Sequence, residues 1–79
     1  MSLDRDKERR DLAKIEASII EGERRISEQR LRVDELRRNG RETAEAETTL
    51  RSFEDSLVEW RHHRDSIIAL IAQIDAGLV

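Results

Sequence analysis

The chain has 79 residues, so it forms one domain at most and buries only a small share of its surface when it folds alone. Charged residues make up 42% of it and proline and cysteine are absent, which is typical of long charged helices and excludes disulfides and cysteine-based zinc sites. The net charge is −3, from +1 over residues 1–38 (11 basic, 10 acidic) and −4 over residues 39–79 (4 basic, 8 acidic), and neither half is basic enough to indicate nucleic-acid binding.

A first helix is predicted over residues 4–38, because apolar positions recur there at alternating spacings of three and four residues. Its heptad stripe consists of Leu12, Ile15, Ile19, Gly22, Ile26, Gln29, Val33 and Leu36. Asn39-Gly40 then supplies a residue able to take positive φ, and Arg37 and Arg38 suit the carboxyl end of a helix dipole. A turn is therefore predicted over residues 39–42.

A second helix is predicted over residues 43–76, with Thr43 as a suitable N-cap and Gly77 just past its end. Its stripe consists of Ala46, Leu50, Phe53, Leu57, Trp60, Arg64, Ile67, Ile71, Ile74 and Leu78. Each helix would span about 50 Å, and the short connector permits only an antiparallel return. The predicted fold is all-α: residues 1–79 form a single antiparallel two-helix coiled-coil hairpin.

Charges beside the two stripes support this register. In an antiparallel pair of helices, the e positions of one heptad face the e positions of the other. Three pairs of opposite sign are thereby expected to meet, namely Arg37 with Glu47, Arg30 with Glu54, and Glu23 with Arg61. Exposed pairs of this kind contribute only about 0–1 kcal/mol each, so they choose the register more than they stabilise it.

Three seam residues interrupt the apolar pattern, namely Gly22, Gln29 and Arg64, and Trp60 is expected to pack near the first of them. Folding the hairpin about residues 41–43 brings Gly22 near Trp60 and Arg64, and we expect its missing side chain to leave room for the indole or the guanidinium stem. Polar seam residues such as Gln29 and Arg64 typically fix register or oligomeric state. We expect Arg64 to reach the bundle edge or pair with a carboxylate, the alternative being recognition of an acidic group on a partner.

Apolar residues outside the stripes widen the apolar surface beyond what one helix can cover. They are Ile20, Leu31, Val58, Ile68 and Leu70. We therefore expect two hairpins to pair as a homodimer, forming a four-helix bundle. The expected interface consists of Ile67, Ile68, Leu70, Ile71 and Ile74.

No pattern in the sequence indicates catalysis, a cofactor or a metal. Glu59 and His62 have the Glu-x-x-His spacing of di-iron bundles, but the register points both side chains toward solvent. His63 flanks the seam, where a surface or interface hydrogen bond is the expected role. The glycines are isolated, and a two-helix hairpin offers no pocket for a serine nucleophile. We expect no enzymatic activity.

Two functions are favoured over a third, an enzyme or metal site assembled at the dimer interface. The leading one is a homo-oligomeric protein–protein interaction module that binds itself and another helical protein through the stripe around Ile67–Ile74. The alternative is a dimer that binds nucleic acid weakly through the arginine-rich first helix, although acidic residues are interleaved with those arginines. The longest apolar run is far shorter than the roughly 20 residues of a membrane span, and no segment has the pattern of a signal peptide. We expect a cytoplasmic location.

The sequence also resembles a family over about residues 16–68. The matching residues are Glu21-Gly22-Glu23-Arg24-Arg25-Ile26, Gln29-Arg30, Gly40, Thr43, Ala46-Glu47, Leu50, Phe53-Glu54, Leu57 and His63-Arg64. They resemble short uncharacterised helical-hairpin proteins of rhizobia and related alphaproteobacteria. Those proteins often have His-Asp between the glycine and the threonine, where this chain has Arg41-Glu42. The resemblance implies a bacterial origin and carries no catalytic motif.

Overall fold

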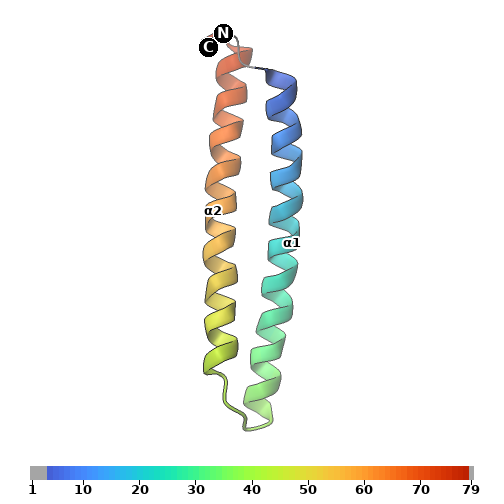
Figure 1. The fold of residues 1–79 in the computed structure, drawn as a ribbon, viewed down its shortest axis with the longest axis vertical. Helices are drawn as coiled ribbons and strands as arrows, with labels where there is room; N and C mark the ends of the chain where they lie inside the picture. The colour runs from blue at the N-terminus through green and yellow to red at the C-terminus, as the bar shows by residue number, and fades with distance from the viewer. Residues whose placement is uncertain (1–3, 79) are drawn as a thin grey trace.

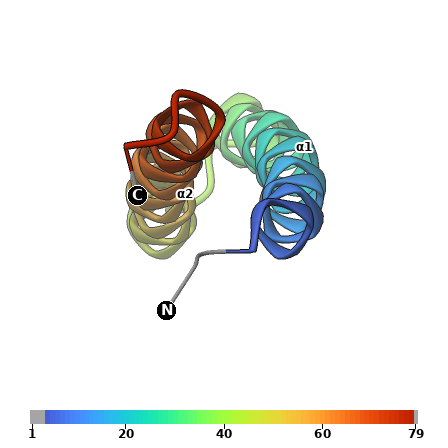
Figure 2. The ribbon, with the colours of Figure 1, turned by 90° about the horizontal axis from the view of Figure 1, so that it is seen from above.

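The computed structural model describes residues 4–78. Its two helices, α1 (Arg5–Arg38) and α2 (Ala44–Asp75), lie side by side and antiparallel (Figure 1). They form a rod with extents of 59 × 16 × 15 Å. Seen from above, the helices incline in opposite directions along their length, as in a coiled coil (Figure 2). The all-α fold of two packed helices is confirmed, and no strand occurs in the described part of the chain.

The helix ends lie within one residue of the positions expected from the sequence, but the N-cap expected for the second helix does not form. Asp4 caps α1, because its carboxylate accepts hydrogen bonds from the backbone amides of Asp6 at 2.9 Å and Lys7 at 3.2 Å. Thr43 precedes α2, yet its side chain makes no capping bond. Its backbone, at φ −113° and ψ −7°, lacks the extended conformation from which a threonine hydroxyl reaches the first amides of a helix.

The turn between the helices depends on one glycine. Gly40 has a φ of 67°, a left-handed conformation that costs a residue with a side chain about 1–2 kcal/mol. The amide of Asn39 donates to the Glu35 carbonyl at 3.1 Å, and the amide of Arg41 donates to the Leu36 carbonyl at 2.8 Å. The carbonyls of Glu35 and Leu36 in the last turn of α1 are thereby satisfied, and the chain reverses direction.

The core is a single seam between the two helices. Its buried residues all belong to the predicted heptad stripes, and they are Ile15, Ile19, Ile26 and Val33 of α1 with Leu57 and Ile67 of α2. Each remains 5–7% exposed, so no described side chain is fully enclosed. Leu12, Leu50, Phe53 and Ile71 pack against the margins of this seam. Two helices alone therefore give a thin core.

Candidate interaction surface

One side of the hairpin carries a line of residues from each helix, spaced seven residues apart and all charged except Ile68. We call this side the charged flank; its residues are Arg9, Glu16, Glu23, Arg30 and Arg37 of α1 with Glu47, Glu54, Arg61, Ile68 and Asp75 of α2. Arg37 Nη2 lies 2.8 Å from Glu47 Oε1, and Arg30 Nη2 lies 3.3 Å from Glu54 Oε2. Both pairs had been predicted. Farther along, Arg9 Nη2 lies 3.9 Å from Asp75 Oδ2.

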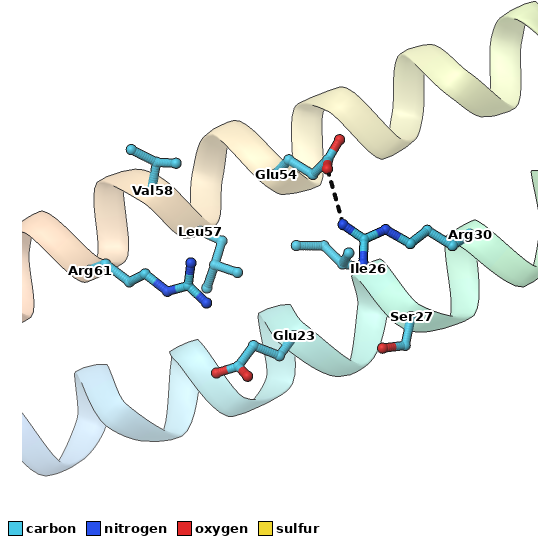
Figure 3. Close-up of a pocket in the computed structure, with 8 residues that line it drawn as sticks. All are labelled: Glu23, Ile26, Ser27, Arg30, Glu54, Leu57, Val58 and Arg61. Carbon is cyan, nitrogen blue, oxygen red and sulfur yellow. Dashed lines mark hydrogen bonds and ion pairs between the residues drawn. The ribbon is translucent and has the colours of Figure 1, made fainter.

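A groove interrupts the charged flank near its middle. It has a volume of about 360 Å³ and lies between the Glu23–Arg61 and Arg30–Glu54 levels (Figure 3). Ile26 and Leu57, both buried, form its apolar floor. Ser27 and Val58 complete the lining, and the Val58 side chain is 49% exposed.

The third predicted charge pair, Glu23 with Arg61, does not form an ion pair. Glu23 and Arg61, both among the described residues, point toward one another across the groove but form no ion pair (Figure 3). Their charged ends therefore stay open to solvent at one end of the apolar floor. Such a surface offers a partner one carboxylate and one guanidinium beside an apolar contact.

Gln29 makes the contact expected of a polar seam residue. Its Nε2 donates a hydrogen bond of 2.9 Å to the carbonyl of Ala46, which belongs to the other helix. Because this bond is directional and half-buried, it favours one axial alignment of the helices over its neighbours.

The packing around Gly22 differs from the expectation. A Cβ added at Gly22 would lie 3.5 Å from Cδ1 of Leu57, with no other contact within 4 Å, so neither Trp60 nor Arg64 occupies the space. Trp60 is 39% exposed, and its ring stacks on His63 with 6.4 Å between centroids. An indole is wider than the aliphatic side chains that set the helix spacing, which explains its place at the seam edge.

Arg64 Nε donates a hydrogen bond to the Asp65 carboxylate at 3.0 Å, in line with the pairing expected of it.

The expected dimer interface is partly used within the hairpin itself. Ile67 is 7% exposed and belongs to the core, and Ile71 packs against that core. Leu70 and Ile74 are half-buried. Only Ile68, at 47% exposure, is largely free, and it lies on the charged flank. Heptad stripe positions face the partner helix first, so Ile67 and Ile71 cannot also supply a broad surface for a second hairpin.

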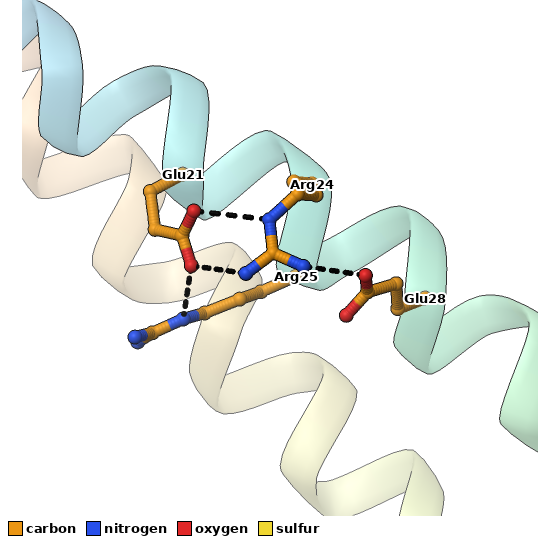
Figure 4. A network of polar contacts seen from close by, with 4 residues as sticks. All are labelled: Glu21, Arg24, Arg25 and Glu28. Carbon is orange, nitrogen blue, oxygen red and sulfur yellow. Dashed lines mark hydrogen bonds and ion pairs between the residues drawn. The ribbon is translucent and has the colours of Figure 1, made fainter.

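The arginine cluster of α1 is engaged by acidic neighbours. Arg24 binds both Glu21 and Glu28, and Arg25 Nε lies 3.3 Å from the same Glu21 carboxylate (Figure 4). The hydrogen bond from Arg24 lowers the pKa of Glu21, and the Glu21 carboxylate raises the pKa of Arg24. These carboxylates would compete with phosphate oxygens for the arginines, which weakens the case for nucleic acid.

The remaining candidates give no second site. Glu59, His62 and His63 are exposed, and residues 4–78 contain no group of three or more histidine or carboxylate side chains placed to hold a metal ion. Within the same residues, neither helix has a stretch both long and apolar enough to cross a membrane. Comparisons with protein families, curated proteins and solved structures find no match to the chain. The bacterial origin implied by the resemblance stays a prediction.

Proposed function

We propose that the protein is an interaction module that associates with a second copy of itself to form a four-helix bundle. The observation that carries the proposal is the exposed area. The chain exposes 6020 Å², whereas a compact monomer of 9.2 kDa exposes about 4,900 Å². The excess of about 1,100 Å² exceeds the roughly 800 Å² per partner that a standard interface buries.

Exposed aliphatic side chains support the same conclusion. Ile20 is 70% exposed, Leu31 61%, Val58 49% and Ile68 47%, whereas the seam buries six of the residues that the structure describes. Burying one large aliphatic side chain contributes about 1.5–3 kcal/mol. Burying two or three of these side chains per copy would therefore contribute a free energy comparable to much of that from the intrachain core. Such a module would bring together the other molecules that its two copies bind.

Sedimentation equilibrium tests the proposal. We expect a dimer at micromolar concentration, with a molar mass near twice the 9.2 kDa of one chain. The circular dichroism signal at each concentration serves as the control, because it reports whether the helices are formed. A fully helical monomer at high micromolar concentration would contradict the proposal.

A further inference from the structure

We propose that the charged flank is where the second copy binds, antiparallel to the first, with the two-fold axis passing across the groove between Glu23–Arg61 and Arg30–Glu54. The inference rests on the self-association proposed above and assigns it a surface and a symmetry. It moves the expected contact away from the stripe around Ile67–Ile74 and toward the middle of the molecule.

The charges of α1 are self-complementary about one point. Along the charged flank, two acidic residues, Glu16 and Glu23, are followed at seven-residue intervals by two basic residues, Arg30 and Arg37. When a second copy lies antiparallel about the midpoint of this series, Glu23 faces Arg30 of the second copy and Glu16 faces Arg37. Every contact between the two α1 lines is then one of opposite sign, and each occurs twice by symmetry.

The two central charges of α2 have the same property about their own midpoint, while Glu47 faces Ile68 of the second copy. Glu54 and Arg61 are seven residues apart, and a two-fold axis between them places Arg61 against Glu54 of the second copy. The midpoints in α1 and α2 come at the same height, because Arg30 pairs with Glu54 within one chain at 3.3 Å. Ile26 and Leu57, which form the floor of the groove, lie at these two midpoints. One axis therefore satisfies both helices.

The side chains at this point also suit close approach. Val58 lies at the rim of the groove and is 49% exposed, so the axis brings the two Val58 side chains together over the apolar floors. Ser27, the facing rim residue on α1, is small. Glu23 and Arg61, which form no ion pair with each other in the described hairpin, each gain a partner of opposite sign.

A second arrangement, with the axis along the rod, would instead place Glu23 against Arg61 of the other copy and Val58 against Ser27. The two arrangements can be distinguished by whether a single introduced cysteine forms a disulfide with the same cysteine in the second copy. The natural chain has no cysteine, so a disulfide formed by Val58→Cys can join only two copies at the same position. Such a bond requires Cα atoms about 4.4–6.8 Å apart.

The experiment oxidises Val58→Cys and a control, Ser52→Cys, which lies outside the charged flank, and follows dimer formation on non-reducing gels. We expect Val58→Cys to cross-link at least about tenfold faster than the control. Equal rates would overturn the proposed axis. A wild-type protein that sediments as a dimer while these rates are equal would leave the proposed function intact, whereas a wild-type monomer would remove both proposals.

A charge exchange provides the second measurement. Glu23→Arg should raise the dimer Kd at least about tenfold, because it places like charges together at two symmetric contacts. Adding Arg30→Glu should lower the Kd again, since the antiparallel pairs are opposite in sign once more, but not to the wild-type value, because the introduced carboxylate also lies beside Glu54 of its own chain. The axis along the rod predicts further weakening instead, because the carboxylate introduced at position 30 would meet Glu54 of the other copy. Glu59→Arg, outside the flank, should leave the Kd unchanged, and helix content by circular dichroism confirms that every variant folds.

Discussion

Near the turn, polar contacts cross the seam alongside the apolar ones, whereas toward the open end the helices are joined mainly by aliphatic side chains. The polar contacts are those of Gln29 with Ala46, Arg30 with Glu54, and Arg37 with Glu47. The aliphatic contacts involve Ile15, Ile19 and Ile67, with Leu12 and Ile71 at the margin. One ion pair, Arg5 Nη1 with Asp75 Oδ1 at 2.8 Å, closes the open end.

The contrast separates two tasks within one simple fold. Hydrogen bonds and ion pairs depend on direction, so those near the turn specify how the helices align. Aliphatic contacts depend on area rather than direction, so those toward the open end supply most of the stability. Each region can be altered without the other, and the variants below are ordered by the size of the expected effect.

The largest effect is expected from the apolar region. Ile19→Ala should lower the free energy of unfolding by about 2–4 kcal/mol, because Ile19 is 5% exposed and its loss leaves a gap in a core one residue wide. The neighbouring Ile20 is the matched control, since it is the same residue type at 70% exposure. In protein dilute enough to be monomeric, Ile20→Ala should change the stability of the hairpin by less than about 0.5 kcal/mol. Urea unfolding followed by circular dichroism measures both, and equal losses would contradict the single-seam core.

A smaller effect is expected from the polar contacts near the turn. Gln29→Ala removes the hydrogen bond to the Ala46 carbonyl and should cost about 0.5–1.5 kcal/mol. Gln73→Ala is the control, because Gln73 is exposed. It should be neutral or slightly stabilising, given the high helix propensity of alanine. If both variants unfold at the same urea concentration, Gln29 does not hold the register.

Two glycines should respond to alanine in opposite directions. Gly22→Ala should stabilise the protein by up to about 1 kcal/mol, because its Cβ would make an ordinary van der Waals contact with Leu57 at 3.5 Å. Gly40→Ala should destabilise it by about 1 kcal/mol, because alanine is strained at a φ of 67° although the space is open. Thermal unfolding should show melting temperatures displaced to either side of the wild-type value. A lower melting temperature for Gly22→Ala would show that the seam is tighter there.

The two helix starts differ in capping, because a side chain caps α1 but none caps α2. Asp4→Ala should cost roughly 0.5–1 kcal/mol, because it removes the acceptor for the amides of Asp6 and Lys7. Thr43→Ala should cost only a few tenths of a kcal/mol, since the Thr43 side chain makes no capping bond. Hydrogen exchange at the first amides of each helix provides the measurement. Faster exchange at α2 in Thr43→Ala than at α1 in Asp4→Ala would reverse the assignment.

The heptad pattern was sufficient to predict the helices and their mutual packing. Every buried residue lies on a predicted stripe, because alternating spacings of three and four residues place side chains on one face of a helix. Two of the three charge pairs across the seam were also predictable, since Arg30 and Arg37 face their partners when the two helices are antiparallel and their stripes are in the expected register. Sequence spacing alone determined the angular position of these residues.

What the pattern could not predict depends on side-chain shape and on local competition. Trp60 occupies a stripe position yet lies at the seam edge, because the pattern records apolarity and not width. Thr43 has the right residue type for a cap, but its backbone conformation decides whether the hydroxyl can reach. Arg24 could pair with Glu21 or with Glu28 and in fact binds both, an outcome that depends on side-chain rotamers rather than on sequence spacing.

The smallest effect is expected at the Glu21 carboxylate, whose contacts lie within one helix rather than between the two. The hydrogen bond from Arg24 depresses the pKa of Glu21 below its ordinary value of 4.5. The pair therefore stabilises the fold fully above about pH 4.5, and this contribution is lost as the pH falls through the lower pKa of the folded state. Arg24→Gln should move the Glu21 pKa back toward 4.5 in an NMR titration, while Arg51→Gln, on α2, should leave it unchanged. An unshifted Glu21 pKa in Arg24→Gln would show that Arg25, 3.3 Å from the same carboxylate, holds it instead.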